Sequence, residues 1–414
     1  MNVDLSRVLE RLDTIYECGK QEDGSHSRLA FSPEDQKGRN LYMSYFRALG
    51  LTPKVDAAGN IRVRLSGRDN TLPAILMGSH LDTVPNGGKY DGALGCVAAL
   101  EVFEVLRRSG MELEHPLEAI VFTDEEGARF GKGLFGSNAI CGHPLPVSKQ
   151  DVDGQGMNQL QVLEEFGVDC GALDQAAISP ENVHCFLELH VEQGASLWRN
   201  EKEIGVVTSI AGVDRFEITL EGQANHAGST LMRDRKDALV TAAEFIAAVP
   251  EVVNTYGGDY SVATVGCVRV EPNSVNVVPG KCVISLEIRD REQAVMDLLL
   301  EKLQEKLESI CSARGVASDL KVISRCPPSP MSDWVIDCVE QSCQEAGRSY
   351  EKMPSGAFHD SLLMSAVFPT GMIFIPSQEG ISHSPLEYSA PTDIENGCDV
   401  LLRTVLTIDK TNRR

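Results

Sequence analysis

The strongest constraint on the fold is a set of apolar runs that each end in histidine or acidic residues. The runs AILMGSHLD, LEAIVFTDEE and CFLELHVEQG follow one another along the chain. A glycine-rich loop with a helical pattern over residues 93–108 separates the first two, and a polar stretch over residues 151–182 precedes the third. Apolar strands that alternate with helices are typical of a sheet covered on both faces. The sequence therefore predicts an α/β domain with a mixed, mainly parallel sheet.

The pattern changes near residue 212. RFEITLEG, SVATVGCVRVEP and CVISLEIRD alternate between apolar and polar residues, with helical patterns over residues 236–248 and 292–311. Two helices against alternating strands predict a small α+β domain. After the turn-rich RCPPSPMSD, GMIFIPS is again typical of a buried strand. We therefore expect one domain formed by residues 1–211 and 329–414, interrupted by an inserted domain of residues 212–328.

Length and composition exclude several classes of protein. A chain of 414 residues is long enough for two cores. A formal net charge of −22 argues against a nucleic-acid partner, and no apolar run approaches the roughly 18 residues of a membrane span. The N-terminal segment lacks the pattern of a secretory signal, so we expect a cytoplasmic protein. The twelve cysteines form no CxxC pair, which favours reduced thiols in the core.

The charged ends of the strands supply a set of candidate metal ligands. The carboxyl ends of parallel strands meet at one edge of a sheet, where such proteins build their sites. Imidazole and carboxylate together favour Zn²⁺, Mn²⁺ or Co²⁺ over Mg²⁺. If one carboxylate bridges, two cations roughly 3.5 to 4 Å apart lower the pKa of a shared water to about 7. The candidate side chains are His80, Asp82, Asp91, Glu125, Glu126, His190 and His383.

Glu125 and Glu126 are adjacent acids that can take two different roles, metal binding and proton transfer. Adjacent residues that leave a strand point in different directions, so one acid can bind metal while the other takes a proton from water. A solvated acidic turn is the alternative. The GKGLFG segment, residues 131–136, has the spacing of a dinucleotide-binding loop, but DEEGARF separates it from the preceding strand. We expect it to form a tight turn beside the metal site.

Six motifs in order, SHLDTV, GGKYDGALG, DEEGARF, ELHVEQG, NHAGST and ISHSP, resemble those of the binuclear-metal amidohydrolases that act on N-carbamoyl compounds. The resemblance covers nearly the whole chain. It implies a catalytic domain split by an inserted lid that also forms a homodimer, with two divalent metal ions per subunit. It further implies that His80 and His190 bind one metal and that Asp91 bridges to a second, held by Glu126 and His383. The remaining implied roles are general base for Glu125 and orientation of His80 for Asp82.

Two members of this family fit the sequence, allantoate amidohydrolase and N-carbamoyl-L-amino acid amidohydrolase. The segments EPNSVNVVPGK and MIFIPSQEGISHSP, together with Arg215, resemble the allantoate enzymes. The expected reaction is then hydrolysis of allantoate to ureidoglycine, ammonia and carbon dioxide, a step of purine catabolism. Ureidoglycolate and β-ureido acid hydrolases are further alternatives. A peptidase of related architecture, or a metal-dependent binding protein without catalysis, represents a different class.

The resemblance also implies residues that bind the substrate. Arg289 is expected to pair with the substrate carboxylate, helped by Asn276 and Arg215, although an ion pair with Glu287 or Asp290 is the alternative for Arg289. Gln193 and His359 are weaker candidates for substrate contact.

His226 is implied to donate to the substrate carbonyl from the partner subunit. A purely structural capping role is the alternative. The motif departs from the family at Leu231, where proline is expected, and this departure concerns the turn of the lid.

Overall fold

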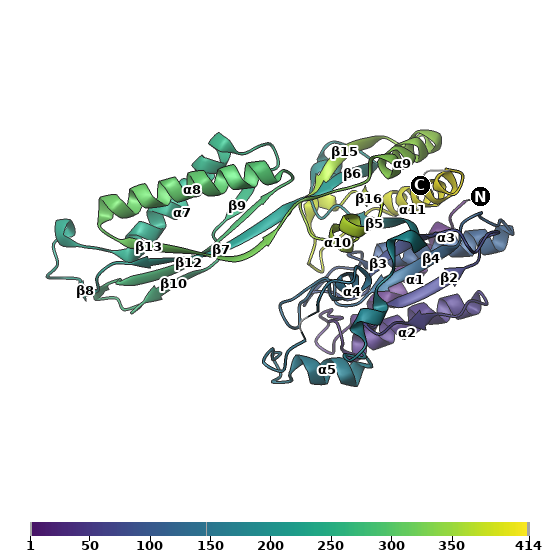
Figure 1. Cartoon of the computed structure of the whole chain (residues 1–414), viewed down its shortest axis with the longest axis horizontal. Coiled ribbons are helices and arrows are strands. Elements are labelled where there is room, and N and C mark those ends of the chain that lie inside the picture. The colour runs from purple at the N-terminus through teal and green to yellow at the C-terminus, as the bar shows by residue number, and fades with distance from the viewer. Residues whose placement is uncertain (1, 146, 412–414) are drawn as a thin grey trace. The chain divides into compact units, whose positions relative to one another are not determined.

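The chain folds into two compact units (Figure 1). The computed structural model describes residues 2–145 and 147–411. Unit 1 consists of Met1–Thr208 and Pro330–Arg414, and unit 2 consists of Ser209–Ser329. Unit 2 is therefore inserted into the sequence of unit 1. The assignment of a catalytic role to unit 1 and of a lid and dimerisation role to unit 2 stays a prediction.

Unit 1 is built on a mixed sheet that is parallel at its centre. β4, β3, β5 and β16 run parallel to one another, whereas β2 pairs antiparallel with β4 and β6 pairs antiparallel with β16. This confirms the predicted α/β class with a mixed, mainly parallel sheet. The order across the sheet is β1 (Lys54–Val55), β2 (Ile61–Leu65), β4 (Leu117–Phe122), β3 (Ala74–His80), β5 (Val183–Val191), β16 (Thr370–Ile375), β6 (Ile204–Ile210) and β14 (Ser329–Pro330), with β15 (Tyr350–Ser355) also on β6.

The central strands are buried on both faces, as their continuous apolar runs require. Every residue of β3, β4 and β5 is buried. The strands approach closely at Gly78, where a Cβ atom would lie 1.8 Å from the carbonyl oxygen of Ile120. Gly95 in α3 (Ala93–Ser109) allows a similar close approach, because a Cβ there would lie 2.4 Å from the carbonyl oxygen of Leu189. Glycine at these two positions lets strand and helix backbones come into contact.

Helices cover the sheet of unit 1, and α3 occurs where the helical pattern over residues 93–108 predicts it. The polar stretch before β5 contains one helix that the sequence pattern did not predict, α5. Asn158 caps its N-terminus by accepting the backbone N–H of Gln161, and Gly167 ends it in the left-handed conformation. The helices are α1 (Leu5–Tyr16), α2 (Pro33–Ala48), α3 (Ala93–Ser109), α4 (Phe135–Ile140), α5 (Gln159–Phe166), α6 (Ser196–Arg199), α9 (Asp333–Ala346), α10 (Asp360–Val367) and α11 (Pro391–Ile408).

Unit 2 is an antiparallel sheet packed against two helices, the predicted α+β arrangement. α7 runs beyond the predicted end at residue 248, because Val249 and Val252 continue the buried face past Pro250. α7 is long and apolar enough to cross a membrane, but its buried face packs in the core of unit 2. The elements are β7 (Gly212–Glu221), β8 (Asn225–His226), α7 (Ala238–Tyr256), β9 (Val262–Thr264), β10 (Val268–Glu271), β11 (Val277–Val278), β12 (Lys281–Asp290), α8 (Gln293–Arg314) and β13 (Ala317–Cys326).

Candidate metal centre

The metal-ligand candidates of unit 1 meet at the carboxyl edge of the parallel strands. His80 is the last residue of β3, and His190 is the penultimate residue of β5. Asp91 directly precedes the N-cap of α3, Glu126 follows β4, and His383 lies in the loop after β16. These five residues come from parts of the chain more than 300 positions apart, and the sheet brings them together as predicted.

The Asp91 carboxylate lies at the middle of this group. Its Oδ1 is 3.4 Å from Nε2 of His80 and 3.3 Å from Nε2 of His190. Its Oδ2 is 3.2 Å from Nε2 of His383, and that nitrogen is 3.5 Å from Oε2 of Glu126. Each oxygen of one carboxylate thus faces a different set of ligands, which is the arrangement of a bridging residue.

The two buried histidines are held with Nε2 ready to bind a cation. His80 Nδ1 is 3.0 Å from the carbonyl oxygen of Asp82, and His190 Nδ1 is 2.8 Å from the carbonyl oxygen of Val191. A carbonyl only accepts, so both Nδ1 atoms carry the proton and both Nε2 atoms keep a lone pair. The backbone N–H of Gly92 donates to His190 Nε2 at 3.1 Å, in agreement with this tautomer.

The donor set fits two divalent ions. Among the described residues, two groups could hold a cation, His80–Asp91–His190 and Asp91–Glu126–His383, with ligand atoms within 4.8 Å of one another in each. Two imidazoles with one carboxylate, and one imidazole with two carboxylates, are the ligand sets of zinc, manganese or cobalt. The proton on each buried Nδ1 is held by the backbone, as is usual for histidines that bind metal.

Glu125 lies beside these groups and is a ligand in neither of them. Its Oε2 is 3.7 Å from Nε2 of His80, and its side chain is 8% exposed. Burial raises the pKa of Glu125 well above its usual value; His80 opposes this, while Glu126 adds to it. Burial alone would raise the pKa of Asp91, but the surrounding imidazoles of His190, His383 and His80 hold it well below its usual value. Burial and then the Asp91 charge also raise the pKa of Glu126, to about 7. Its position outside both ligand groups therefore distinguishes Glu125 as the carboxylate that is free to carry a proton.

Asp82 contacts His80 through its main chain and uses its carboxylate elsewhere. The carboxylate Oδ1 is 3.8 Å from His80 Nδ1, too far for a hydrogen bond. Oδ1 accepts instead the backbone N–H of Glu125 at 3.3 Å, and Oδ2 accepts that of Glu126 at 3.2 Å. Asp82 thus connects the His80 turn to the turn that carries both acids.

The GKGLFG segment lies beside the acidic turn as expected, but it leads into α4 and the tight turn itself falls at residues 128–130. The backbone N–H groups of Leu134, Phe135 and Gly136 donate to the carbonyl oxygens of residues 125, 124 and 123. A Cβ at Gly133 would lie 2.2 Å from the carbonyl oxygen of Glu125. The segment therefore lies directly along the acidic turn and fixes its backbone.

Strained backbone marks the same edge of the sheet. Asp124, Gln193 and His383 have φ angles of 52°, 58° and 52°. Such left-handed conformations in residues other than glycine persist where the surroundings impose them, often at functional sites.

Gln193 and His359 both lie at this edge. Gln193 Nε2 donates to Asp91 Oδ2 at 2.6 Å. His359 is 1% exposed and packs on the His190 ring with centroids 4.4 Å apart. Its pKa is lowered well below the usual value by burial and then by His190, so it is a neutral ring that supports a ligand. Direct substrate contact by either residue stays a prediction.

Arg215 and Arg289 lie together on the sheet of unit 2. Arg215 Nε donates to Glu287 Oε2 at 2.8 Å, and Arg289 Nε donates to Glu287 Oε1 at 2.8 Å. The ion pair between Arg289 and Glu287 that sequence reasoning left open is therefore present. A role of the pair in binding substrate stays a prediction.

His226 and Asn276 occur at the other end of the unit 2 sheet. The two-stranded ribbon of β8 and β11 pairs His226 with Val277. His226 Nδ1 accepts the backbone N–H of Gly228 at 3.1 Å and of Ser229 at 3.2 Å, so Nε2 carries the proton. Asn276 Oδ1 accepts the Ser274 hydroxyl at 2.9 Å. The exposed His226 ring is thus set as a hydrogen-bond donor.

No motif singled out Arg28, a fully buried residue next to the centre. Its Nε donates to the carbonyl oxygen of Leu81 at 2.6 Å and its Nη1 to that of Ile15 at 2.9 Å. Arg28 therefore fixes the turn between His80 and Asp82. An arginine in a polar segment carries no periodic signal, and its burial depends on contacts distant in sequence.

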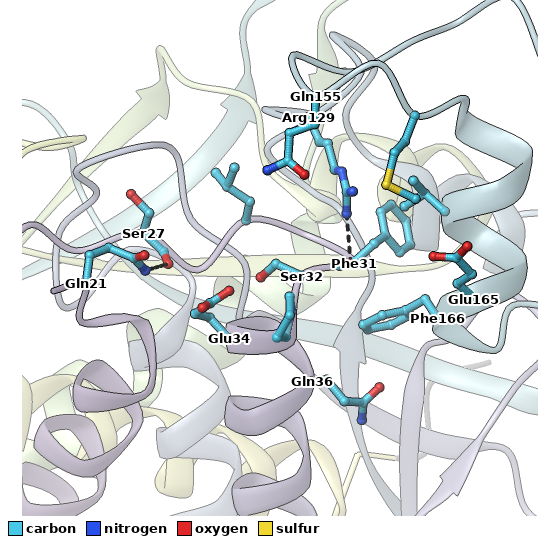
Figure 2. A pocket seen from close by; sticks show the side chains of 14 residues that line it. Gln21, Ser27, Phe31, Ser32, Glu34, Gln36, Arg129, Gln155, Glu165 and Phe166 are labelled. Atoms are coloured by element: carbon cyan, nitrogen blue, oxygen red, sulfur yellow. Dashed lines mark hydrogen bonds between the residues drawn. The ribbon is translucent and has the colours of Figure 1, made fainter.

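A separate cavity of about 560 Å³ in unit 1 is lined by residues of α2 and α5 and the segments near them (Figure 2). Arg129 reaches across it and donates to the carbonyl oxygen of Phe31 at 2.8 Å, and Phe166 lines one side. Among the described residues that line this cavity, none is a predicted site residue.

Comparison with known proteins places this fold and site in one class. Residues 76–407 match Peptidase family M20/M25/M40, and the chain belongs to this family. It is 37% identical to an N-carbamoyl-L-amino acid amidohydrolase of Geobacillus stearothermophilus, over 96% of this chain and 97% of that one. It is 33% identical to the allantoate amidohydrolase of Escherichia coli, over 95% of each chain. A crystal structure of an amidase of the hydantoinase/carbamoylase family from Burkholderia multivorans matches with a TM-score of 0.90 at 32% identity, over 99% of both chains.

Proposed function

We propose that this protein is a two-metal amidohydrolase that cleaves the ureido C–N bond of a small carboxylate. The observation that carries the proposal is the Asp91 carboxylate, whose two oxygens face two separate ligand groups beside Glu125. The names of the relatives at 33–37% identity support a substrate with an N-carbamoyl group.

Allantoate is the substrate that we propose first. The segments EPNSVNVVPGK and MIFIPSQEGISHSP and residue Arg215 support it, by resemblance to allantoate enzymes. An N-carbamoyl-L-amino acid is the second candidate, because the relative that bears this name is slightly more similar, 37% against 33% identical. Both compounds carry a ureido group and a carboxylate, and the proposed chemistry is the same for both.

The catalytic step assigns separate tasks to the two acids. When bound, divalent cations polarise the ureido carbonyl and acidify water. Glu125 takes a proton from the attacking water and passes it to the leaving nitrogen, for which its buried carboxylate with a raised pKa is suited. Glu126, Asp91 and the histidines hold the cations, and Asp82 fixes the backbone of the acidic turn.

Unit 2 supplies the proposed groups for substrate recognition. Arg215, Glu287 and Arg289 together carry one net positive charge, which suits a carboxylate. We assign the pairing with the substrate carboxylate to Arg289, helped by Asn276 and Arg215. The Nε2–H of His226 is assigned to the substrate carbonyl, where it stabilises the developing negative charge.

We also propose that the enzyme is a homodimer in the cytoplasm. His226 acts from the partner subunit in this account, which makes the dimer necessary for catalysis. Buried thiols such as Cys96, Cys185 and Cys398 suit a reducing compartment.

A substrate panel tests the proposed function. The metal-loaded enzyme is assayed for ammonia release from allantoate, several N-carbamoyl-L-amino acids, ureidoglycolate and N-carbamoyl-β-alanine, and for cleavage of dipeptides. We expect ureido acids to be hydrolysed, with the highest kcat/KM for allantoate. Cleavage of dipeptides alone, or no turnover of any ureido acid, would contradict the proposal.

A further inference from the structure

Glu387 is a buried carboxylate that connects two ligand-bearing loops. Its side chain comes from the loop after β16 and is almost fully buried, with the residue 6% exposed. Oε1 accepts the backbone N–H of Tyr90 at 2.7 Å and of Asp91 at 3.1 Å. Oε2 accepts the hydroxyl of Ser382 at 2.7 Å. One carboxylate thus holds the backbone of Asp91 and the residue next to His383.

The His383 loop needs such support because its conformation is strained. His383 has a φ of 52°, a left-handed conformation that is unfavourable for a residue other than glycine. Ser382 precedes it and Glu387 follows it, and the hydrogen bond between these two side chains closes the loop around His383. Ser382 Oγ also lies 3.3 Å from Asp91 Oδ2, the oxygen that faces His383.

The opposite side of the carboxylate is equally restricted. A Cβ at Gly88 would lie 2.3 Å from Cδ of Glu387, so a side chain at this position in the Asp91 loop would displace the Glu387 carboxylate. The raised pKa of Glu387 comes from burial and from the nearby Asp91 charge, while the hydrogen bonds oppose it. The loops that carry Asp91 and His383 are therefore packed closely around the Glu387 side chain.

We propose that Glu387 is a positioning residue that sets the spacing of Asp91 and His383, and thereby the occupancy of the Asp91–Glu126–His383 cation site. His80 and His190 are held by main-chain carbonyls that Glu387 does not contact. The first site shares only Asp91 with the second, so loss of Glu387 affects the second site, which also contains His383, more strongly. This inference rests on the proposed two-metal function.

Two substitutions separate positioning from charge. Glu387→Gln keeps a carbonyl oxygen for the N–H groups of Tyr90 and Asp91, and its amide can donate to Ser382, so the geometry is retained. Glu387→Ala removes all three hydrogen bonds. Leu386→Ala is the matched control, because Leu386 is the neighbouring residue, is 74% exposed and contributes only its backbone N–H to the loop's hydrogen bonds.

The test measures Zn²⁺ binding by equilibrium dialysis and elemental analysis, on the full-length protein and without substrate. We expect two Zn²⁺ per chain for the natural protein, Leu386→Ala and Glu387→Gln. For Glu387→Ala we expect one ion retained and the other bound 10 to 100-fold more weakly, the range found when a group that orients a ligand is lost. Combining Glu387→Ala with His383→Ala should weaken binding no further than His383→Ala alone.

Several results would overturn the inference. These are unchanged binding of both ions by Glu387→Ala, equal weakening of both ions, or equal losses in the Ala and Gln variants. If Glu387→Ala does not fold by circular dichroism, Ser382→Ala takes its place and should weaken the same single ion. A natural protein that binds two ions but hydrolyses no ureido acid would refute the proposed function and leave this inference standing.

Discussion

Glu125 and Glu126 are adjacent in sequence and meet different partners. Glu126 Oε2 faces His383, whereas Glu125 Oε2 faces His80 from outside the ligand group. Their backbone N–H groups share the carboxylate of Asp82. The difference in role therefore comes from the side-chain directions, which a fixed backbone preserves.

Substitution of each acid by glutamine should give opposite results. Glu125→Gln should keep both metals and lower kcat by several orders of magnitude, because the proton acceptor is removed. Glu126→Gln should lose one metal, because a ligand is removed. Elemental analysis beside kcat measurements distinguishes the two. Loss of metal in Glu125→Gln instead would reverse the assignment.

At the scale of the elements, the sequence predicts strands from local patterns but does not predict contacts between distant segments. The apolar runs of β3, β4 and β5 and the alternation of β7 and β12 are local, and the strands occur where the pattern places them. The sequence therefore predicted correctly that the candidate ligands lie together, while their binding of metal stays a prediction. Residue type alone does not specify contacts between distant segments. Such contacts determine the role of the Asp82 carboxylate, the burial of Arg28 and the hydrogen bonds of Glu387.

At the end of the unit 1 sheet away from the candidate metal centre, three aromatic rings pack together near the start of β5. His184 at the start of β5 lies between His115 and Trp334, with ring centroids 4.3 and 5.4 Å away. Burial lowers the pKa of His184 to about 4, with a further contribution from His115. The folded state thus keeps the ring neutral, and the unfolded chain binds the proton first. Its contribution to stability is present above pH 6.5 and is lost as the pH falls from about 6.5 toward 4.

His184→Phe keeps an aromatic ring in the stack and removes this titration. We expect the fall in Tm between pH 7 and pH 5 to be smaller in the variant than in the natural protein. Differential scanning calorimetry in the presence of a chelator checks this without a contribution from metal release. Equal pH dependence of the two proteins would show that His184 does not titrate on unfolding.

At the scale of the whole molecule, the proposed substrate residues Arg289 and His226 lie far apart within unit 2. Arg289 and Lys281 are eight residues apart along β12, about 26 Å at roughly 3.3 Å per residue. The ribbon with His226 continues from the Lys281 end, where Gly222 bonds to Gly280. Unit 2 therefore carries Arg289 on its main sheet and His226 on a ribbon beyond the far end of that sheet, as expected if the two residues act in different active sites.

Mixed dimers test this division. Glu125→Gln and His226→Ala subunits are each expected to be inactive alone. After random exchange, about half of the dimers are mixed and each has one intact site, so activity should approach about a quarter of the natural level. No recovery, with heterodimers confirmed by native mass spectrometry, would show that His226 does not act in the partner's site.

Elemental analysis of the natural protein and of Asp91→Ala tests the central claim, a pair of cations that share one carboxylate, most directly. The account predicts two divalent ions per chain in the natural protein, loss of activity with a chelator, and recovery with Mn²⁺, Co²⁺ or Zn²⁺. Asp91→Ala should lose both ions together, because both ligand groups contain Asp91. Full turnover by metal-stripped protein, or retention of both ions in Asp91→Ala, would contradict it.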